Sequence, residues 1–168
     1  YHIRRASRKK GIPVIVADPR ETELVPFTSL WLPLRPNSDS ELIHGIAQIL
    51  MNKGLYDRDF VNRFTEGMEE YERSLSFLEP ERVCELTGLE ARAVEKAAGL
   101  LAGKRIAFVL GHGIFLQPQG PQVVDGVVNL ALMTGSADNE RSGFYRIARE
   151  NNEAGAWDMG TVPHALPG

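Results

Sequence analysis

The chain has 168 residues, of which 43% are hydrophobic and 24% are charged, a composition typical of one soluble globular domain. Its formal net charge of −3 argues against a general nucleic-acid or membrane-surface binder, and its apolar runs are too short to cross a bilayer. Cys84 is the single cysteine, which excludes an intrachain disulfide and a cysteine cluster for zinc or iron–sulfur within this sequence.

The first elements alternate between helix and strand. Residues 1–10 predict a helix that carries basic residues at its C-terminal end, and Gly11 is typical of the residue that ends such a helix. The β-branched run at residues 13–17 predicts a buried parallel strand. Because the chain begins within this helical pattern and stops in a loop, we expect it to be a piece of a longer protein.

A second strand and a helical segment follow. Residues 21–28 predict a short helix or turn, and residues 30–34 predict a strand in which Pro33 indicates a sheet edge or a bulge. Either Ser38 or Asp39 is suited to begin the next helix as its N-cap. Amphipathic patterns then predict a series of helices that begin near Ser40, Asp57, Met68, Glu79 and Leu89.

The clearest strand of the sequence lies at residues 106–110, which we expect to be buried, and Gly111-His112-Gly113 follows it directly. Residues 122–134 predict a strongly apolar helix. Residues 135–168 have no periodic pattern, so we expect mostly loop there, and a loop of that length is usually functional or disordered. The alternation of strands and helices predicts one α/β domain over residues 1–168, layered around a mainly parallel sheet with a helical insert.

Ligands of open α/β sheets bind beyond the carboxyl ends of the strands, where this chain places three polar or glycine-containing segments. Asp18, in Asp18-Pro19-Arg20, can accept from ribose hydroxyls or a purine amine, or it can simply open a turn. Asp39 can recognise guanine or a sugar, or act as an N-cap. One carboxylate can serve both purposes, because each of its oxygens can accept separately.

Gly111-His112-Gly113 allows a ligand to approach the backbone closely, or forms a tight turn. It is an incomplete dinucleotide fingerprint, since Leu116 stands where the third glycine would be. His112 has no evident partner for general-base catalysis, so we assign no catalytic residue. The histidines show no metal-ligand spacing, so we assign no metal ligand either.

The run at residues 151–160 combines adjacent amides, carboxylates and glycines without an apolar stripe. A packed core gains little from such residues, whereas a polar ligand gains donors, acceptors and accessible backbone. We therefore expect this run to contact a large bound cofactor. Its candidate contact residues are Asn151, Asn152, Gly155, Asp158 and Gly160.

Several motifs together resemble one known family. They lie in order at residues 14–20, 32–39, 54–60, 85–89, 129–135 and 151–160. The sequence is similar to the catalytic subunits of molybdopterin oxidoreductases, most of all to the formate dehydrogenase α subunit. The related large iron–sulfur subunit of respiratory NADH dehydrogenase is similar as well. The resemblance implies a Rossmann-like three-layer sandwich.

The resemblance also implies a cofactor, a bis(molybdopterin guanine dinucleotide) that carries molybdenum or tungsten. By the matching motifs, Asp18 and Arg20 would lie at the nucleotide ribose, and Ser38 and Asp39 would recognise guanine. Gly111, His112 and Gly113 would lie near the pterin and phosphates. Asn151, Asn152, Gly155, Asp158 and Gly160 would complete the cofactor loop.

Other parts that the resemblance implies lie outside this sequence, among them a [4Fe–4S] cluster, the metal-ligating cysteine or selenocysteine and a further cofactor domain. We therefore expect no activity from this piece alone. The implied partners are the remaining domains of the subunit and iron–sulfur electron-transfer subunits, without nucleic acid or direct membrane insertion. The implied location is cytoplasmic, with membrane association only through partner subunits.

The sequence departs from the family pattern at three places, one of which is residues 136–143, where a more regular glycine-rich turn is replaced. Asn37-Ser38 replaces a Gly-Thr pair in the guanine turn, although Asn tolerates the left-handed conformation. Phe115-Leu116 replaces a polar pair after the glycine-containing segment. Besides a formate dehydrogenase-like enzyme, the sequence thus leaves open a cofactor-free scaffold subunit of a respiratory NADH dehydrogenase complex and a generic nucleotide-binding module.

Overall fold

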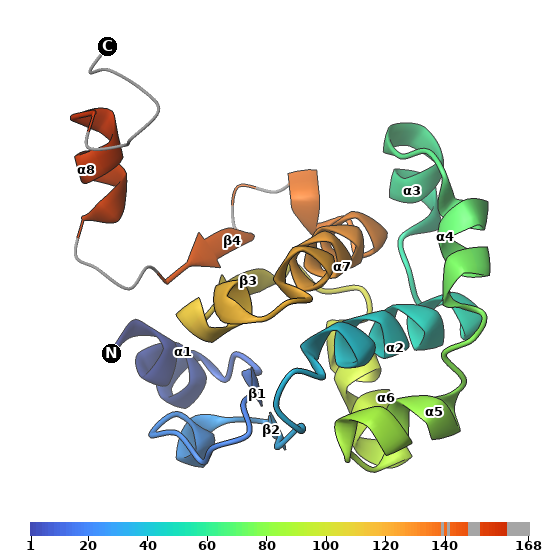
Figure 1. Ribbon diagram of the computed structural model, residues 1–168, viewed down its shortest axis with the longest axis horizontal. Coiled ribbons are helices and arrows are strands. Elements are labelled where there is room, and N and C mark those ends of the chain that lie inside the picture. The colour runs from blue at the N-terminus through green and yellow to red at the C-terminus, as the bar shows by residue number, and fades with distance from the viewer. Residues whose placement is uncertain (139, 141, 148–151, 161–168) are drawn as a thin grey trace.

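The computed structural model of the chain describes residues 1–138, 140, 142–147 and 152–160. It contains two short parallel sheets and a larger set of helices (Figure 1). The α/β class and the parallel pairing that the sequence predicts are confirmed. The parallel strands form two separate two-stranded sheets, β1–β2 and β3–β4.

The N-terminal part follows the predicted order. Helix α1 (His2–Lys10) ends at Gly11, whose φ of 61° is the left-handed conformation that glycine adopts without steric cost. Strand β1 (Ile15–Ala17) pairs with β2 (Leu30–Leu32), and the 3-10 helix η1 (Val25–Phe27) connects them. The expectation that β1 is buried is wrong, because its first two residues are half-buried and Ala17 is exposed.

The helical insert contains five α-helices: α2 (Asp39–Asn52), α3 (Arg58–Phe64), α4 (Met68–Leu75), α5 (Pro80–Thr87) and α6 (Ala91–Leu101). Asp57 caps α3, since its carboxylate accepts from the Phe60 N–H at 2.9 Å. Val61 of this helix is buried, whereas Phe64 is 59% exposed.

The last part of the chain contains strand β3, helix α7 and several short elements. Strand β3 (Ala107–Leu110) is followed by the 3-10 helix η2 (His112–Leu116) and by α7 (Gly120–Met133). The predicted loop contains three short elements: the 3-10 helix η3 (Ser136–Asp138), strand β4 (Gly143–Arg146) and helix α8 (Glu153–Asp158). The sequence did not predict these three elements, because elements this short show no periodicity and β4 forms by pairing with β3.

Strand β3 was expected to be buried, and this expectation is wrong in part. Leu110 is 9% exposed, but Val109, on the opposite face of the strand, is 44% exposed. The exposed face belongs to a sheet of only two strands. A parallel sheet is normally covered on both faces.

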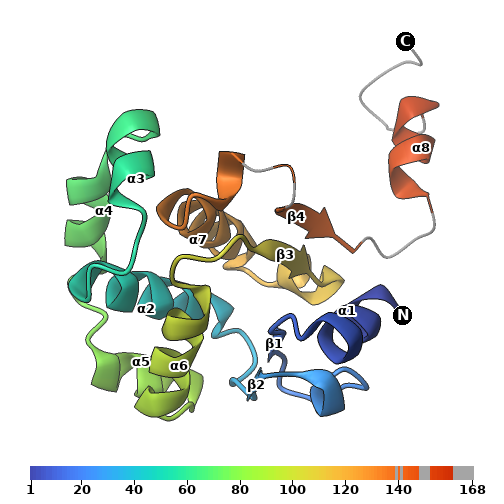
Figure 2. The same cartoon turned by 180° about the vertical axis from the view of Figure 1, so that it is seen from behind.

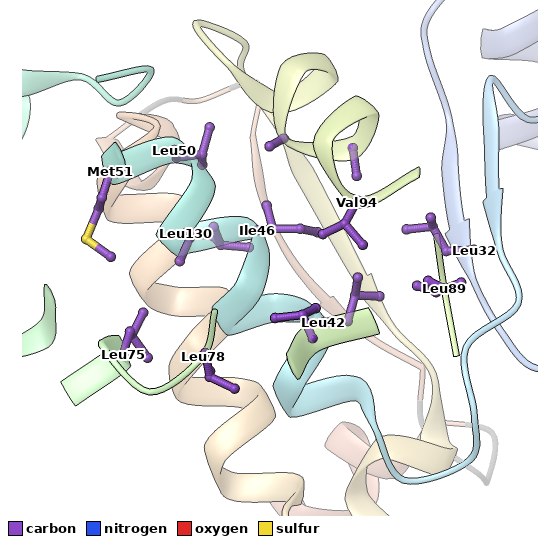
Figure 3. Packing of buried hydrophobic residues seen from close by; sticks show 14 of the residues in the cluster. Leu32, Leu42, Ile46, Leu50, Met51, Leu75, Leu78, Leu89, Val94 and Leu130 are labelled. Carbon is purple, nitrogen blue, oxygen red and sulfur yellow. The ribbon is translucent and has the colours of Figure 1, made fainter. Parts of the chain in front are cut away.

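The hydrophobic core is centred on α2, which contacts α4, α5, α6 and α7. Figure 3 shows Leu42, Ile46 and Leu50 of α2 in one cluster with Leu130 of α7. Side chains of β2 and of the residues after it reach the same cluster, so the helical insert is packed against the first sheet. This packing fixes the N-terminal end of α2 beside the strand ends.

Helix α8 lies beyond the end of β4, apart from the α2–α7 core, as the view from behind in Figure 2 also shows. In the described part of the chain, the helices are too short or too polar to cross a membrane.

Candidate functional site

Each of the three predicted ligand segments lies just beyond the carboxyl end of a strand. Asp18 directly follows β1, Gly111 directly follows β3, and the turn at residues 35–39 begins shortly after β2 and ends at the first residue of α2. Strands β1 and β2 are parallel, and so are β3 and β4, so the two strands of each pair have their carboxyl ends at the same end of the sheet. The residues that the sequence analysis identified lie at or near these ends.

Asp18 forms a local turn and retains one free oxygen. Its Oδ1 accepts from the Arg20 N–H at 2.8 Å and lies 3.5 Å from Arg20 Nε. Trp31 Nε1 donates to the Asp18 carbonyl oxygen at 3.0 Å, which fixes the turn against β2. Oδ2 has no hydrogen-bond partner among the described residues. The turn and the ligand interpretations of Asp18 are therefore compatible.

The turn before α2 is held rigidly by its own contacts. Asn37 has a φ of 63°, the left-handed conformation that the sequence analysis allowed for this residue. Ser38 is buried, and its Oγ donates to the Arg35 carbonyl oxygen at 2.7 Å. Ser38 occupies the N-cap position, but its side chain makes no capping hydrogen bond. Ser38 thus shapes the turn and does not cap the helix.

Asp39 connects the start of α2 with the segment that follows β3. Its Oδ2 accepts from Gln117 Nε2 at 2.8 Å, and both side chains are half-buried. Two buried polar atoms of the same segment, His112 Nδ1 and Gln117 Oε1, have no hydrogen-bond partner among the described residues. The structure thus joins Asp39 to Gln117, and the segment from His112 to Gln117 has buried polar atoms that remain available for a ligand.

Gln117 was not identified from the sequence. It lies only four residues after Gly113, and it is the polar side chain that ends an otherwise apolar stretch. The hydrogen bond to Asp39 spans 78 positions in the sequence, so only the packing of α7 against α2 reveals it.

Neither conformation nor packing explains Gly111 and Gly113. Neither has a positive φ, and a Cβ atom on either would meet no atom within 4 Å. In contrast, a Cβ on Gly120 would lie 2.6 Å from the Ile114 carbonyl oxygen, so that glycine is required by packing. The open space at Gly111 and Gly113 leaves the backbone accessible to another molecule.

The run at residues 151–160 forms helix α8 and its ends. Asn152 has a φ of 56° and precedes the helix, and its side chain lies against Gly155, where a Cβ would be 2.5 Å from Nδ2. Asp158 is exposed at the last helical position, and Gly160 has a φ of 76°. Asn151 lies outside the described residues. The structure does not bring α8 next to α2 (Figure 1).

Arg146 connects α8 with the segment after β3. Its guanidinium lies 5.0 Å from the centre of the Phe115 ring and 5.6 Å from the centre of the Trp157 ring. This contact gives Phe115, one of the departures from the family pattern, a structural role. The sequence analysis missed it, because Arg146 lies on β4 in the region predicted as loop.

Two other features of the described residues lie away from these segments. A surface hollow between the end of α4 and α5 is lined by residues such as Phe77 and Arg82 and contains none of the predicted cofactor residues. No group of three or more His, Cys, Asp or Glu side chains is arranged to hold a metal ion within the described ranges. The polar atoms around Asp39 and Gly111 therefore remain the candidate site.

Comparison with known proteins gives a family match. Residues 1–166 match the family model described as molybdopterin oxidoreductase. Formate dehydrogenase H of Escherichia coli (strain K12) is 33% identical over 163 residues, which are 96% of this chain and 23% of that protein. The assimilatory nitrate reductase catalytic subunit of Bacillus subtilis (strain 168) is 29% identical over 163 residues, 96% of this chain and 23% of that protein.

A solved structure is similar as well. The acetylene hydratase from Pelobacter acetylenicus has a TM-score of 0.77 and 30% sequence identity to the chain. The match covers 81% of this chain and 19% of that structure. The chain therefore spans less than a quarter of the length of each of these relatives.

Proposed function

Because the chain belongs to the molybdopterin oxidoreductase family, we propose that it binds the guanine dinucleotide end of the cofactor in a larger enzyme. The observation that carries this proposal is the hydrogen bond between Asp39 and Gln117. It joins the predicted guanine-binding turn to a residue four positions after the predicted pterin and phosphate residues 111–113. This contact supports a single site formed from separate family motifs.

The polar atoms of the site fit such a ligand. A guanine dinucleotide offers N–H donors, hydroxyl groups and phosphate oxygens. His112 Nδ1 and Gln117 Oε1 are buried without partners among the described residues, and buried polar atoms are usually paired in a complete structure. The open space at Gly111 and Gly113 admits a phosphate close to the backbone.

The residues would divide the binding between them. Asp39 would accept from guanine N–H groups, and Ser38 would hold the turn in shape. The free Oδ2 of Asp18 would accept from a ribose hydroxyl, with Arg20 beside it. When bound, the cofactor supplies two-electron redox chemistry at molybdenum or tungsten, while these residues bind and orient it.

We propose formate as the substrate of the complete enzyme, which would oxidise it to CO2 with release of a proton and two electrons. The similarity to formate dehydrogenase H supports formate, and the similarity to a nitrate reductase makes nitrate the main competitor. A [4Fe–4S] cluster and iron–sulfur partner subunits would then receive the electrons in the cytoplasm. Assays of the complete protein with formate and with nitrate would separate the two substrates.

The test of the site is cofactor loading of the complete parent protein with Asp39→Ala. Loss of a hydrogen bond to a charged group costs about 1.5–3 kcal/mol, so we expect cofactor affinity to fall about tenfold or more. Metal content by mass spectrometry and oxidised-pterin fluorescence measure the loading. Asp59→Ala is the matched control, because Asp59 is also an acidic residue in the first turn of a helix and is exposed.

Unchanged metal and pterin content in Asp39→Ala would refute the role of Asp39. A wild-type parent protein that contains no molybdenum, tungsten or pterin would refute cofactor binding altogether. That result would support the cofactor-free scaffold instead.

A further inference from the structure

Residues 85–89, which form the junction between α5 and α6, match one of the family motifs, but the candidate site includes none of them. This junction makes two hydrogen bonds with Arg35. The Arg35 N–H donates to the Thr87 carbonyl oxygen at 2.8 Å, and Arg35 Nη1 donates to the Glu85 carbonyl oxygen. Arg35 is the first residue of the turn before α2, so the junction is joined directly to that turn.

Gly88 leaves the space that the Arg35 side chain occupies. A Cβ at Gly88 would lie 3.1 Å from Arg35 Nε and 3.2 Å from Arg35 Cγ. Leu34 and Leu89, the neighbours of these two residues, belong to the same hydrophobic cluster. The backbone of the junction and the backbone that enters the turn are therefore fixed relative to each other.

The Arg35 carbonyl oxygen holds the rest of the turn. It accepts from the Ser38 N–H at 3.2 Å and from Ser38 Oγ at 2.7 Å. The Ser38 carbonyl oxygen in turn accepts from the Leu42 N–H at 3.2 Å, so the first turn of α2 begins from Ser38. Asp39 is the next residue, and its carboxylate reaches Gln117. The place of the Asp39 carboxylate thus depends on Arg35 through Ser38.

We propose that Arg35 is a positioning residue for guanine binding and that the junction at residues 85–89 orients its side chain. The inference rests on the proposed function, because it assigns the placement of Asp39 to a residue outside the ligand contacts. The competing interpretation is that Arg35 only stabilises the domain by attaching α5 to the end of β2. A contact of that kind would change global unfolding, whereas a positioning contact changes the turn and the cofactor it holds.

Residue-resolved hydrogen exchange of the complete parent protein separates these interpretations. Arg35→Met keeps a long side chain but has no N–H donor. We expect the Ser38 amide to exchange about threefold to tenfold faster in this variant, as the loss of one hydrogen bond allows. The amide of Leu50, which is buried in the middle of α2, should keep its rate.

Cofactor release from the same samples measures the effect on binding. We expect Arg35→Met to lose metal and pterin during dialysis about threefold to tenfold faster than the wild type. Arg35→Lys should restore both measurements towards wild type, because an ammonium group can also donate to the Glu85 carbonyl oxygen. Arg73→Met is the matched control, since Arg73 is exposed on α4 and its Nε donates to the Glu69 carbonyl oxygen at 3.3 Å.

A second variant changes the junction and leaves Arg35 in place. Gly88→Ala puts a methyl group against the arginine side chain, so it should also speed Ser38 exchange and cofactor release. Gly11→Ala is its matched control. Both glycines end a helix in the left-handed conformation, with φ of 72° and 61°, but a Cβ at Gly11 meets nothing within 4 Å. The shared cost of that conformation cancels in the comparison.

Several results would overturn the proposal. Unchanged Ser38 exchange in Arg35→Met is one, and equal acceleration of Ser38 and Leu50 is another, because it would indicate a contribution to global stability alone. Faster Ser38 exchange with unchanged cofactor release would remove the link to binding. A wild-type parent without cofactor would refute the proposed function, and the exchange rates would still show whether Arg35 holds the turn.

Discussion

Ser38 and Asp39 are adjacent in the sequence, but their side chains make different contacts. Ser38 is 5% exposed, and its hydroxyl donates a hydrogen bond to the Arg35 carbonyl oxygen of the same turn. Asp39 is half-buried and reaches the Gln117 amide on a distant segment. Direct ligand contact is therefore more compatible with Asp39, and the contribution of Ser38 lies in the shape of the turn.

The buried ring of His44 is expected to make the free energy of unfolding depend on pH. Burial lowers the pKa of His44 below its usual 6.5, although a hydrogen bond at Ser40 and the charges of Glu41 and Asp125 oppose this. The ring also lies edge-on to Tyr71, at 6.2 Å between centres. The folded state thus prefers the neutral imidazole, whereas the unfolded chain takes up a proton near pH 6.5.

We therefore expect the contribution of His44 to be complete above about pH 6.5 and to be lost as the pH falls from there towards the lower folded-state pKa. Urea unfolding at about pH 7.5 and about pH 5.5 measures this loss. The His44→Gln variant should show a smaller difference between the two pH values. An equal pH dependence in both proteins would contradict the assignment.

At the level of elements, the contact between α2 and α5 depends on Gly45. A Cβ at this position would lie 2.8 Å from both methyl carbons of Val83, which is 2% exposed. A β-branched side chain has little freedom to move away. Gly45→Ala should therefore destabilise the domain by about 1–3 kcal/mol, as overpacked cores do.

Gly99 on α6 is the matched control, because a Cβ there meets nothing within 4 Å. Gly99→Ala should stabilise the domain by about 0.4–1 kcal/mol through the reduced entropy of the unfolded chain. The double variant Gly45→Ala with Val83→Ala should lose less stability than the sum of its single variants, as urea unfolding would show. Additive losses would mean that the two residues do not clash.

The helices and strands also show how much of the fold can be predicted from the sequence. Long periodic segments such as α2 and α7 were located within one or two residues, because one face of each helix is apolar. Strands β1 and β3 were predicted from their β-branched and apolar residues. Their exposure was not predicted, because the burial of a strand depends on neighbours that are distant in the sequence. Strand β4 was missed for the same reason.

The candidate site, too, could be predicted only in part from the sequence. The turn residues after β1, β2 and β3 were identified because glycine, proline and short polar residues mark strand ends. Gln117 and Arg146 were not identified, since each contacts a residue that is distant in the sequence, Asp39 and Phe115 respectively. Sequence patterns therefore indicated the segments of the site, and the tertiary packing selected the contacts between them.

At the scale of the whole molecule, one hydrophobic cluster joins the first sheet to the helical insert, because Leu32 of β2 and Leu42 of α2 both belong to it and are each 1% exposed. Leu32→Ala should therefore destabilise the domain by about 2–5 kcal/mol, as large-to-small substitutions in cores do. Urea unfolding measures this loss. Leu55→Ala is the matched control, because Leu55 is 37% exposed and should lose much less. Equal losses for the two variants would contradict a core shared by the sheet and the helices.

The contact of Arg146 with Trp157 has an optical consequence. The chain has two tryptophans, and Trp31 lies in β2 while Trp157 lies on α8. In a Trp31→Phe variant, the tryptophan emission would come from Trp157 alone, which is 51% exposed and whose ring lies beside the Arg146 guanidinium. Its emission wavelength would then report, in real time, whether α8 stays joined to the segment that follows β3 or moves when a ligand arrives.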